Sequence, residues 1–212
     1  MALSSFLVGW NKPMLAFLSW YLGVSLLGLL AFPLAWRLFP ALADRGYSLS
    51  RAFGLMLWGF IFWLLASLGV VQNDAGGLLL ALAVLAGASL WIFWRARRQE
   101  GSPFHAWWKH NRRLVISVEV LFLLAFAGWA FIRACNPELT SAGGEKTMEV
   151  AFINAILRSE TFPPHDPWLS GYAISYYYFG YVLTAMLAQS TGVAGSGAHN
   201  LMLALTFALS AV

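Results

Sequence analysis

The chain has few charged residues: Asp, Glu, Lys and Arg together make up 10% of its 212 residues. A soluble domain carries roughly a quarter charged residues, which cover its surface. This scarcity excludes a water-soluble globular domain and predicts that most of the surface faces lipid. The chain also has a single cysteine, Cys135, which excludes an internal disulfide framework and does not indicate a redox compartment.

The N-terminus lacks the pattern of a cleaved secretory signal peptide. Lys12 is the one basic residue before the first apolar run, which is too long for an h-region and has no small-residue cleavage pattern. We therefore expect this run to be retained as a transmembrane helix. The net charge of +4 does not indicate a nucleic-acid partner, because the basic residues cluster in short loops between apolar runs.

Hydrophobic residues make up 60% of the chain, and the mean hydropathy is +0.69. They form long runs, and a helix needs about 20 consecutive apolar residues to cross a bilayer. Five runs are expected to cross completely: residues 14–39, 52–71, 76–94, 114–132 and 173–187. A sixth run, 201–212, is too short to cross, so we expect the chain to be truncated there.

The predicted fold class is therefore all-α, a polytopic integral membrane helix bundle with the lipid bilayer as its partner. We expect two parts in this bundle. Residues 1–113 are an N-terminal three-helix membrane region with a cytoplasmic loop. Residues 114–212 are the start of a second membrane domain that carries an outer loop, 133–171.

The positive charges predict the orientation of the bundle. Nine of the thirteen Lys and Arg residues lie in the two segments that follow the first and third runs. Alternating spans place these two segments on one side of the membrane, and basic loops are usually cytoplasmic. The N-terminus and loop 133–171 are therefore predicted to lie outside the cytoplasm.

Loop 133–171 is the segment in which chemistry is expected. It holds five of the nine acidic residues: Glu138, Glu145, Glu149, Glu160 and Asp166. Residues 146–158 predict a short helix, with Glu145 and Glu149 on one face because they are four residues apart. Its other face is apolar and is expected to lie on the membrane surface or against another helix. The tyrosine triplet 176–178 follows at the outer mouth of the fifth run. A helical triplet spreads over about 200°, so part of it must face protein or a cavity.

Five segments carry a resemblance to a known family. They read DRGYSL at 44–49, GEKTME at 144–149, AILRS at 155–159, PPHDPW at 163–168 and YYYFG at 176–180. In these segments the chain resembles the YYY-domain integral membrane proteins, large hydrophobic proteins of unknown function named for a YYYxG motif. The resemblance covers nearly the whole chain. It departs from the family pattern at Glu149, where Asp is expected, and at Thr147, where Pro is expected.

More distantly, the outer loop is similar to that of lipid-donor glycosyltransferases of the GT-C type. Those enzymes transfer a sugar from a polyprenyl-phosphate carrier to an acceptor on the outer side. The similarity implies a GT-C-like bundle with Glu145 or Glu149 as general base and Asp166 as a second acid. That second acid could stabilise charge or hold a divalent cation, Mg²⁺ or Mn²⁺. The implied substrate-binding residues are Lys146 or Arg158 for the phosphate, with His165, Trp168, Tyr176, Tyr177 and Tyr178.

Each of these residues also has a structural interpretation. The two glutamates of the loop helix can be helix-capping charges, Asp166 can open a turn, and the tyrosines can form an interfacial belt. Glu119 lies inside the fourth run, where we expect it to reach the interface or to pair with Arg112. The alternative functions are a transporter or flippase, which would have discontinuous helices and paired intramembrane charges, and a non-catalytic membrane scaffold.

Overall fold

The computed structural model describes residues 2–100, 103–139 and 144–212. Within these ranges the elements are seven α-helices, and no β-strand is found. The helices are α1 (Ala2–Leu38), α2 (Ser50–Ser67), α3 (Ala75–Glu100), α4 (Pro103–Cys135), α5 (Lys146–Arg158), α6 (Phe179–Thr191) and α7 (Gly195–Ser210). Segments of α1 to α4 are long and apolar enough to cross a membrane: Lys12–Leu38, Ser50–Ser67, Ala75–Arg98 and His105–Cys135. The predicted all-α polytopic membrane bundle is confirmed.

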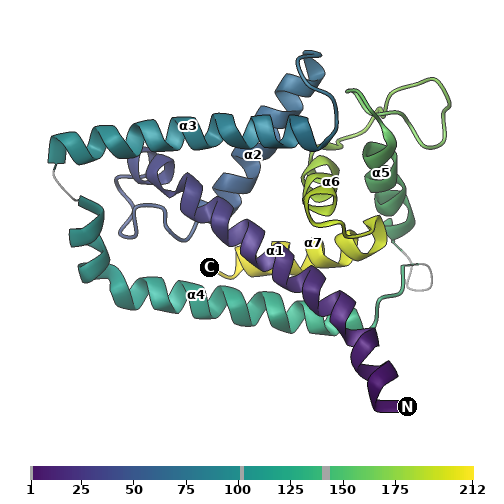
Figure 1. The fold of residues 1–212 in the computed structure, drawn as a ribbon, viewed down its shortest axis with the longest axis horizontal. Coiled ribbons are helices and arrows are strands. Elements are labelled where there is room, and N and C mark those ends of the chain that lie inside the picture. The colour runs from purple at the N-terminus through teal and green to yellow at the C-terminus, as the bar shows by residue number, and fades with distance from the viewer. Residues whose placement is uncertain (1, 101–102, 140–143) are drawn as a thin grey trace.

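The two ends of the bundle hold different connecting segments. Figure 1 shows the start of α1, the α2–α3 turn, the end of α4 and helix α5 at one end, and the α1–α2 and α3–α4 connections at the other. Asn73 in the α2–α3 turn fixes the end of α5. Its side-chain amide donates to the carbonyl oxygens of Ile156, at 2.6 Å, and Ser159, at 2.7 Å. The basic connections therefore share the end opposite α5, as alternating spans require; which end faces the cytoplasm stays a prediction.

The fifth and sixth runs differ from the prediction. Residues 173–178 are not helical, and α6 has only 13 residues before Gly192, whose positive φ of 69° ends the helix. Helix α7 begins at Gly195, earlier than predicted, has 16 residues and is bent by 116° from α6. Helices of these lengths span about 20 and 24 Å, less than the 30 Å hydrocarbon core. The prediction of a complete fifth span was therefore wrong: α6 and α7 form one broken span or a re-entrant loop.

The core lies where α1, α2, α3, α4 and α6 meet. Trp20, Phe62, Phe122 and Phe126 are fully buried there. Helices α1 and α2 approach closely, because a Cβ atom on Gly54 would lie 2.6 Å from the carbonyl oxygen of Leu27. Large apolar side chains also cover the outside of the spans, which is expected of helices that face lipid. Examples of these exposed side chains are Leu15, Leu26, Leu79, Trp91 and Leu124.

A charged cluster joins α2 to α4. Arg51 Nη2 donates to Glu119 Oε2 at 2.5 Å, and the hydroxyl of Tyr47 donates to Glu119 Oε1 at 2.7 Å. The Arg51 guanidinium also lies 4.2 Å from the centroid of the Phe122 ring. The predicted pairing of Glu119 with Arg112 was wrong, because the cation comes from a different helix. The sequence indicates only that the acid needs a partner; the packing of α2 on α4 selects it.

Candidate functional site

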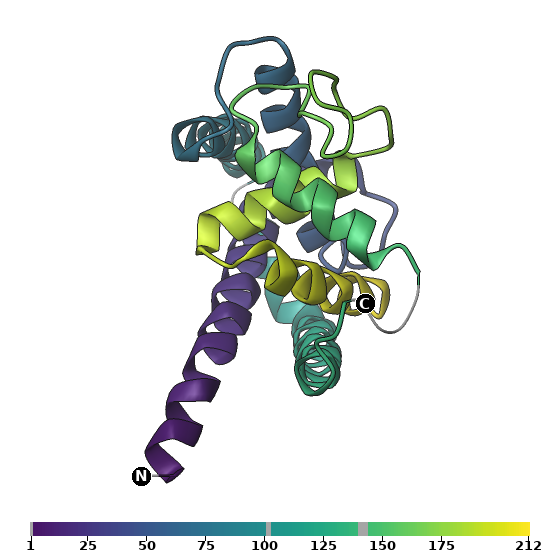
Figure 2. The same ribbon diagram turned by 90° about the vertical axis from the view of Figure 1, so that its right-hand side faces the viewer.

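The loop helix α5 begins and ends at the predicted residues, and its packing positions the candidate site. Its apolar face buries Phe152, Ile153 and Ile156. Helix α5 packs against α6 and α7, so of the two expected locations the structure selects contact with other helices. Figure 2 shows α5 lying across α6 beside α7. This packing directs Glu149, in the first turn of α5, toward α7.

Glu149 forms a pair with His199 of α7. Glu149 Oε2 lies 2.6 Å from His199 Nε2. When the carboxylate is ionised it only accepts hydrogen bonds, and Nε2 is then the donor in this contact. His199 is 4% exposed, and its second nitrogen, Nδ1, is buried without a hydrogen-bond partner among the described residues. Glu149 is partly exposed, with 30% of its side chain accessible. The pair therefore joins a buried imidazole to an accessible carboxylate.

Sequence reasoning missed His199. The signal that could have found it is an ionisable side chain within an apolar segment, because such residues are expensive in a membrane and are functional candidates by default. The last apolar run was expected to begin at Leu201, so His199 lay outside every predicted span. The structure starts α7 at Gly195 and so places His199 on the helix, facing α5.

The tyrosine triplet precedes α6 and its members separate. The ring of Tyr176 stacks on Phe152 of α5 with centroids 5.5 Å apart, and its hydroxyl donates to that of Tyr177 at 2.6 Å. That hydrogen bond, together with the nearby negative charge of Glu145, raises the pKa of Tyr176 to about 12. Tyr177 is 72% exposed. Tyr178 instead accepts a hydrogen bond from Trp63 Nε1 of α2 at 3.1 Å. Tyr176 and Tyr177 therefore lie together near Glu145, with Tyr176 against α5, whereas Tyr178 contacts α2.

The second predicted acid, Asp166, has a structural role. Its Oδ1 accepts hydrogen bonds from the backbone N–H groups of Trp168, at 2.8 Å, and Leu169, at 2.9 Å, and so caps a turn. The exposed His165 forms an antiparallel bridge with Ala173. The Trp168 ring packs edge-on against Phe152, with centroids 5.3 Å apart. Among these residues, Trp168 reaches the helix that carries Glu149.

The two predicted phosphate partners lie at opposite ends of α5. Lys146 is the first residue of the 13-residue helix and Arg158 the last, so they are separated by about 18 Å along its axis. They cannot both bind one phosphate. Lys146 shares the first turn with Glu149, whereas Arg158 lies at the distant end.

The described acidic and histidine side chains of the candidate site do not by themselves form a metal-binding site. Glu149 is engaged by His199, and one oxygen of Asp166 is engaged by its turn. In the part of the chain that the structure describes, no group of three or more His, Cys, Asp or Glu side chains could hold a metal ion. The Mg²⁺ or Mn²⁺ that the resemblance implies stays a prediction.

Comparison with known proteins places this architecture in a family. A family model described as "Uncharacterized membrane protein (DUF2298)" matches residues 57–212, a range that includes α5, the tyrosine triplet and α7. No curated protein and no solved structure matches the chain. Because the match covers most of its length, the chain belongs to the DUF2298 family of uncharacterised membrane proteins.

Proposed function

We propose that this protein is a membrane glycosyltransferase that moves a sugar from a polyprenyl-phosphate donor to an acceptor hydroxyl at the outer face. The observation that carries the proposal is the 2.6 Å contact between Glu149 and His199. A charge-assisted hydrogen bond of this kind fixes the orientation of a carboxylate. With Oε2 held by His199, Oε1 remains to accept a proton, as a general base must.

The proposed reaction uses these positions. The acceptor hydroxyl transfers its proton to Glu149 Oε1 while its oxygen forms a bond to the anomeric carbon of the sugar. The bond from that carbon to the phosphate oxygen breaks, and the polyprenyl phosphate leaves with the bonding electron pair. The buried His199 holds the carboxylate in place throughout, so it is a positioning residue.

The aromatic side chains around Phe152 supply a surface for the sugar. Tyr176 and Trp168 both pack on Phe152, and Tyr177 lies beside Tyr176 with most of its ring accessible. Sugar rings bind to aromatic faces through their apolar C–H surfaces. In this proposal Lys146 balances charge near Glu149, and the turn-capping Asp166 has no catalytic role.

The test uses the full chain in nanodiscs with polyprenyl-phosphate-linked sugars, and it measures the release of free polyprenyl phosphate. Glu149→Gln is expected to lower the rate about 10²- to 10⁴-fold, the usual contribution of a general base. The matched control is Glu160→Gln, an exposed acid of the same loop, which is expected to retain the wild-type rate. A wild-type rate in Glu149→Gln would contradict the proposal.

One observation favours the alternative of a transporter or flippase. Transporters often build their sites from discontinuous helices, and α6 and α7 are joined by a sharp bend of 116°. A transporter moves its substrate across proteoliposomes without covalent change, whereas the transferase converts the donor. Mass spectrometry of the recovered lipid separates the two. The scaffold alternative predicts that neither process occurs and that neutralising Glu149 changes only stability.

A further inference from the structure

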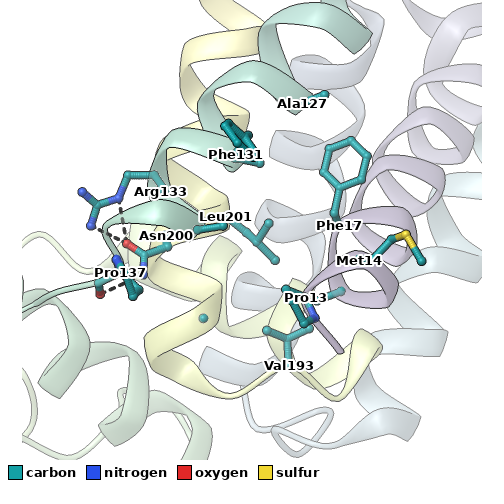
Figure 3. Close-up of a pocket in the computed structure, with 14 residues that line it drawn as sticks. Pro13, Met14, Phe17, Ala127, Phe131, Arg133, Pro137, Val193, Asn200 and Leu201 are labelled. Atoms are coloured by element: carbon teal, nitrogen blue, oxygen red, sulfur yellow. Dashed lines mark hydrogen bonds between the residues drawn. The ribbon is translucent and has the colours of Figure 1, made fainter. Parts of the chain in front are cut away.

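An apolar cavity lies beside α7, on a different face from His199. Its volume is about 620 Å³, within the usual range for small-molecule sites. Phe17 of α1, Phe131 of α4 and Leu201 of α7 contribute to its walls. Figure 3 shows these side chains around the cavity, with Arg133 and Asn200 at one edge. The walls suit a hydrocarbon chain, and the edge is polar.

Asn200 contacts the Arg133 guanidinium at this edge. Its Nε and Nη2 atoms donate to Asn200 Oδ1 at 2.9 and 2.6 Å, and the Asn200 amide donates to the carbonyl oxygen of Pro137 at 3.4 Å. A guanidinium has five N–H donors, and this contact uses two of them. The partner is a neutral amide, so the positive charge is not balanced by it. Asn200 therefore orients the guanidinium without neutralising it.

Arg133 lies at the end of a candidate membrane span, His105–Cys135. It lies in the last turn of α4 and lines the same cavity as Pro13, which is next to the start of the membrane-spanning part of α1 at Lys12. Cationic side chains at the ends of spans reach the headgroup layer, where lipid phosphates lie. The apolar walls extend from this level along the spans. This arrangement complements an amphiphile with a phosphate at one end and a long apolar chain.

We propose that this cavity binds the polyprenyl phosphate of the donor, with the phosphate on Arg133 and the prenyl chain against Phe17, Phe131 and Leu201. This assignment rests on the proposed transferase function. Arg133 replaces Lys146 and Arg158 as the phosphate partner. Asn200 directly follows His199 on α7. Asn200 orients the Arg133 guanidinium for the leaving phosphate, and His199 orients the Glu149 carboxylate that acts as the base.

Binding is tested without catalysis. A polyprenyl phosphate is titrated into the full chain in nanodiscs, and bound lipid is measured by native mass spectrometry. Arg133→Gln is expected to weaken binding about tenfold or more, because the phosphate loses its charge-assisted hydrogen bonds to the guanidinium. The matched control, Arg113→Gln, removes an exposed arginine near the other end of α4 and is expected to bind as the wild type does. Leu201→Trp fills the cavity and is expected to reduce binding with Arg133 intact.

Three results would overturn the assignment. One is wild-type binding by both Arg133→Gln and Leu201→Trp. Another is binding of the uncharged polyprenol as tight as that of its phosphate, which would show an apolar groove only. A third is equal competition by phosphatidylglycerol, which would show a site for bulk bilayer lipid. Failure of the transferase proposal alone is distinguishable: transfer would be absent or independent of Glu149 while binding still depended on Arg133.

Discussion

Removal of the Glu119 carboxylate is expected to destabilise the bundle strongly. Arg51 is buried, with 5% of its side chain exposed, and Glu119 is its ion-pair partner at 2.5 Å. In Glu119→Leu the guanidinium keeps, among the described residues, its long contacts to Ser25, at 3.4 Å, and its contact with the Phe122 ring. The perturbation therefore leaves an uncompensated positive charge between α2 and α4.

The expected loss of unfolding free energy is about 3–5 kcal/mol, the usual cost of removing one partner of a buried ion pair. This lowers the folded-to-unfolded ratio by roughly two to three and a half orders of magnitude. Glu119→Gln is expected to cost less, because its amide oxygen still accepts from Arg51. The double variant Arg51→Met, Glu119→Leu is expected to recover most of the loss, because an apolar pair leaves no buried charge.

The measurement is an unfolding titration with SDS in mixed micelles, followed by circular dichroism. Arg112→Met is the matched control: it removes an exposed arginine of α4, and a change within about 0.5 kcal/mol is expected. The reasoning is refuted if Glu119→Leu is no less stable than Arg112→Met. It is refuted equally if the effects of the two single substitutions add in the double variant, because a coupled pair cannot be additive.

Three further predictions concern packing, orientation and the tyrosines. Gly54→Ala is expected to lower the free energy of unfolding by about 1–3 kcal/mol in the same titration, because its Cβ would lie 2.6 Å from a carbonyl oxygen of α1. Gly87→Ala, with open space around it, is the control and should not destabilise the bundle. Equal stability of the two variants would contradict the close α1–α2 contact. The exposed Cys135 is expected to react with a membrane-impermeant maleimide in intact cells, and labelling only after permeabilisation would reverse the predicted orientation. Tyr177→Phe is expected to lower the pKa of Tyr176 from about 12 toward the ordinary value of 10.0. The measurement is the difference in tyrosinate absorbance between the two proteins in an alkaline titration. An unchanged pKa would show that the hydrogen bond between the two hydroxyls does not control the pKa of Tyr176.

Local sequence determined the membrane class, the four long spans and α5. Ten per cent charge and long apolar runs leave no soluble alternative, because a helix in lipid must be apolar over its own length. Helix α5 could be predicted because its boundaries depend on nearby residues: acids at its start and a proline-rich segment after its end. These features are encoded within a few turns of chain, so no partner segment is needed to find them.

Only the tertiary structure decided which residues meet. Fifty positions separate Glu149 from His199, and 68 separate Arg51 from Glu119. Each contact depends on how far one helix is rotated and shifted against another, which side-chain packing over the whole interface sets. The bend after Gly192 belongs to the same class, since the sequence shows a break between the apolar runs 173–187 and 201–212 but does not record the 116° change of direction. The sequence therefore determined that this chain is an integral membrane protein. Packing between distant helices decided that the Glu149 carboxylate, the His199 imidazole and the Arg133 guanidinium form its candidate sites.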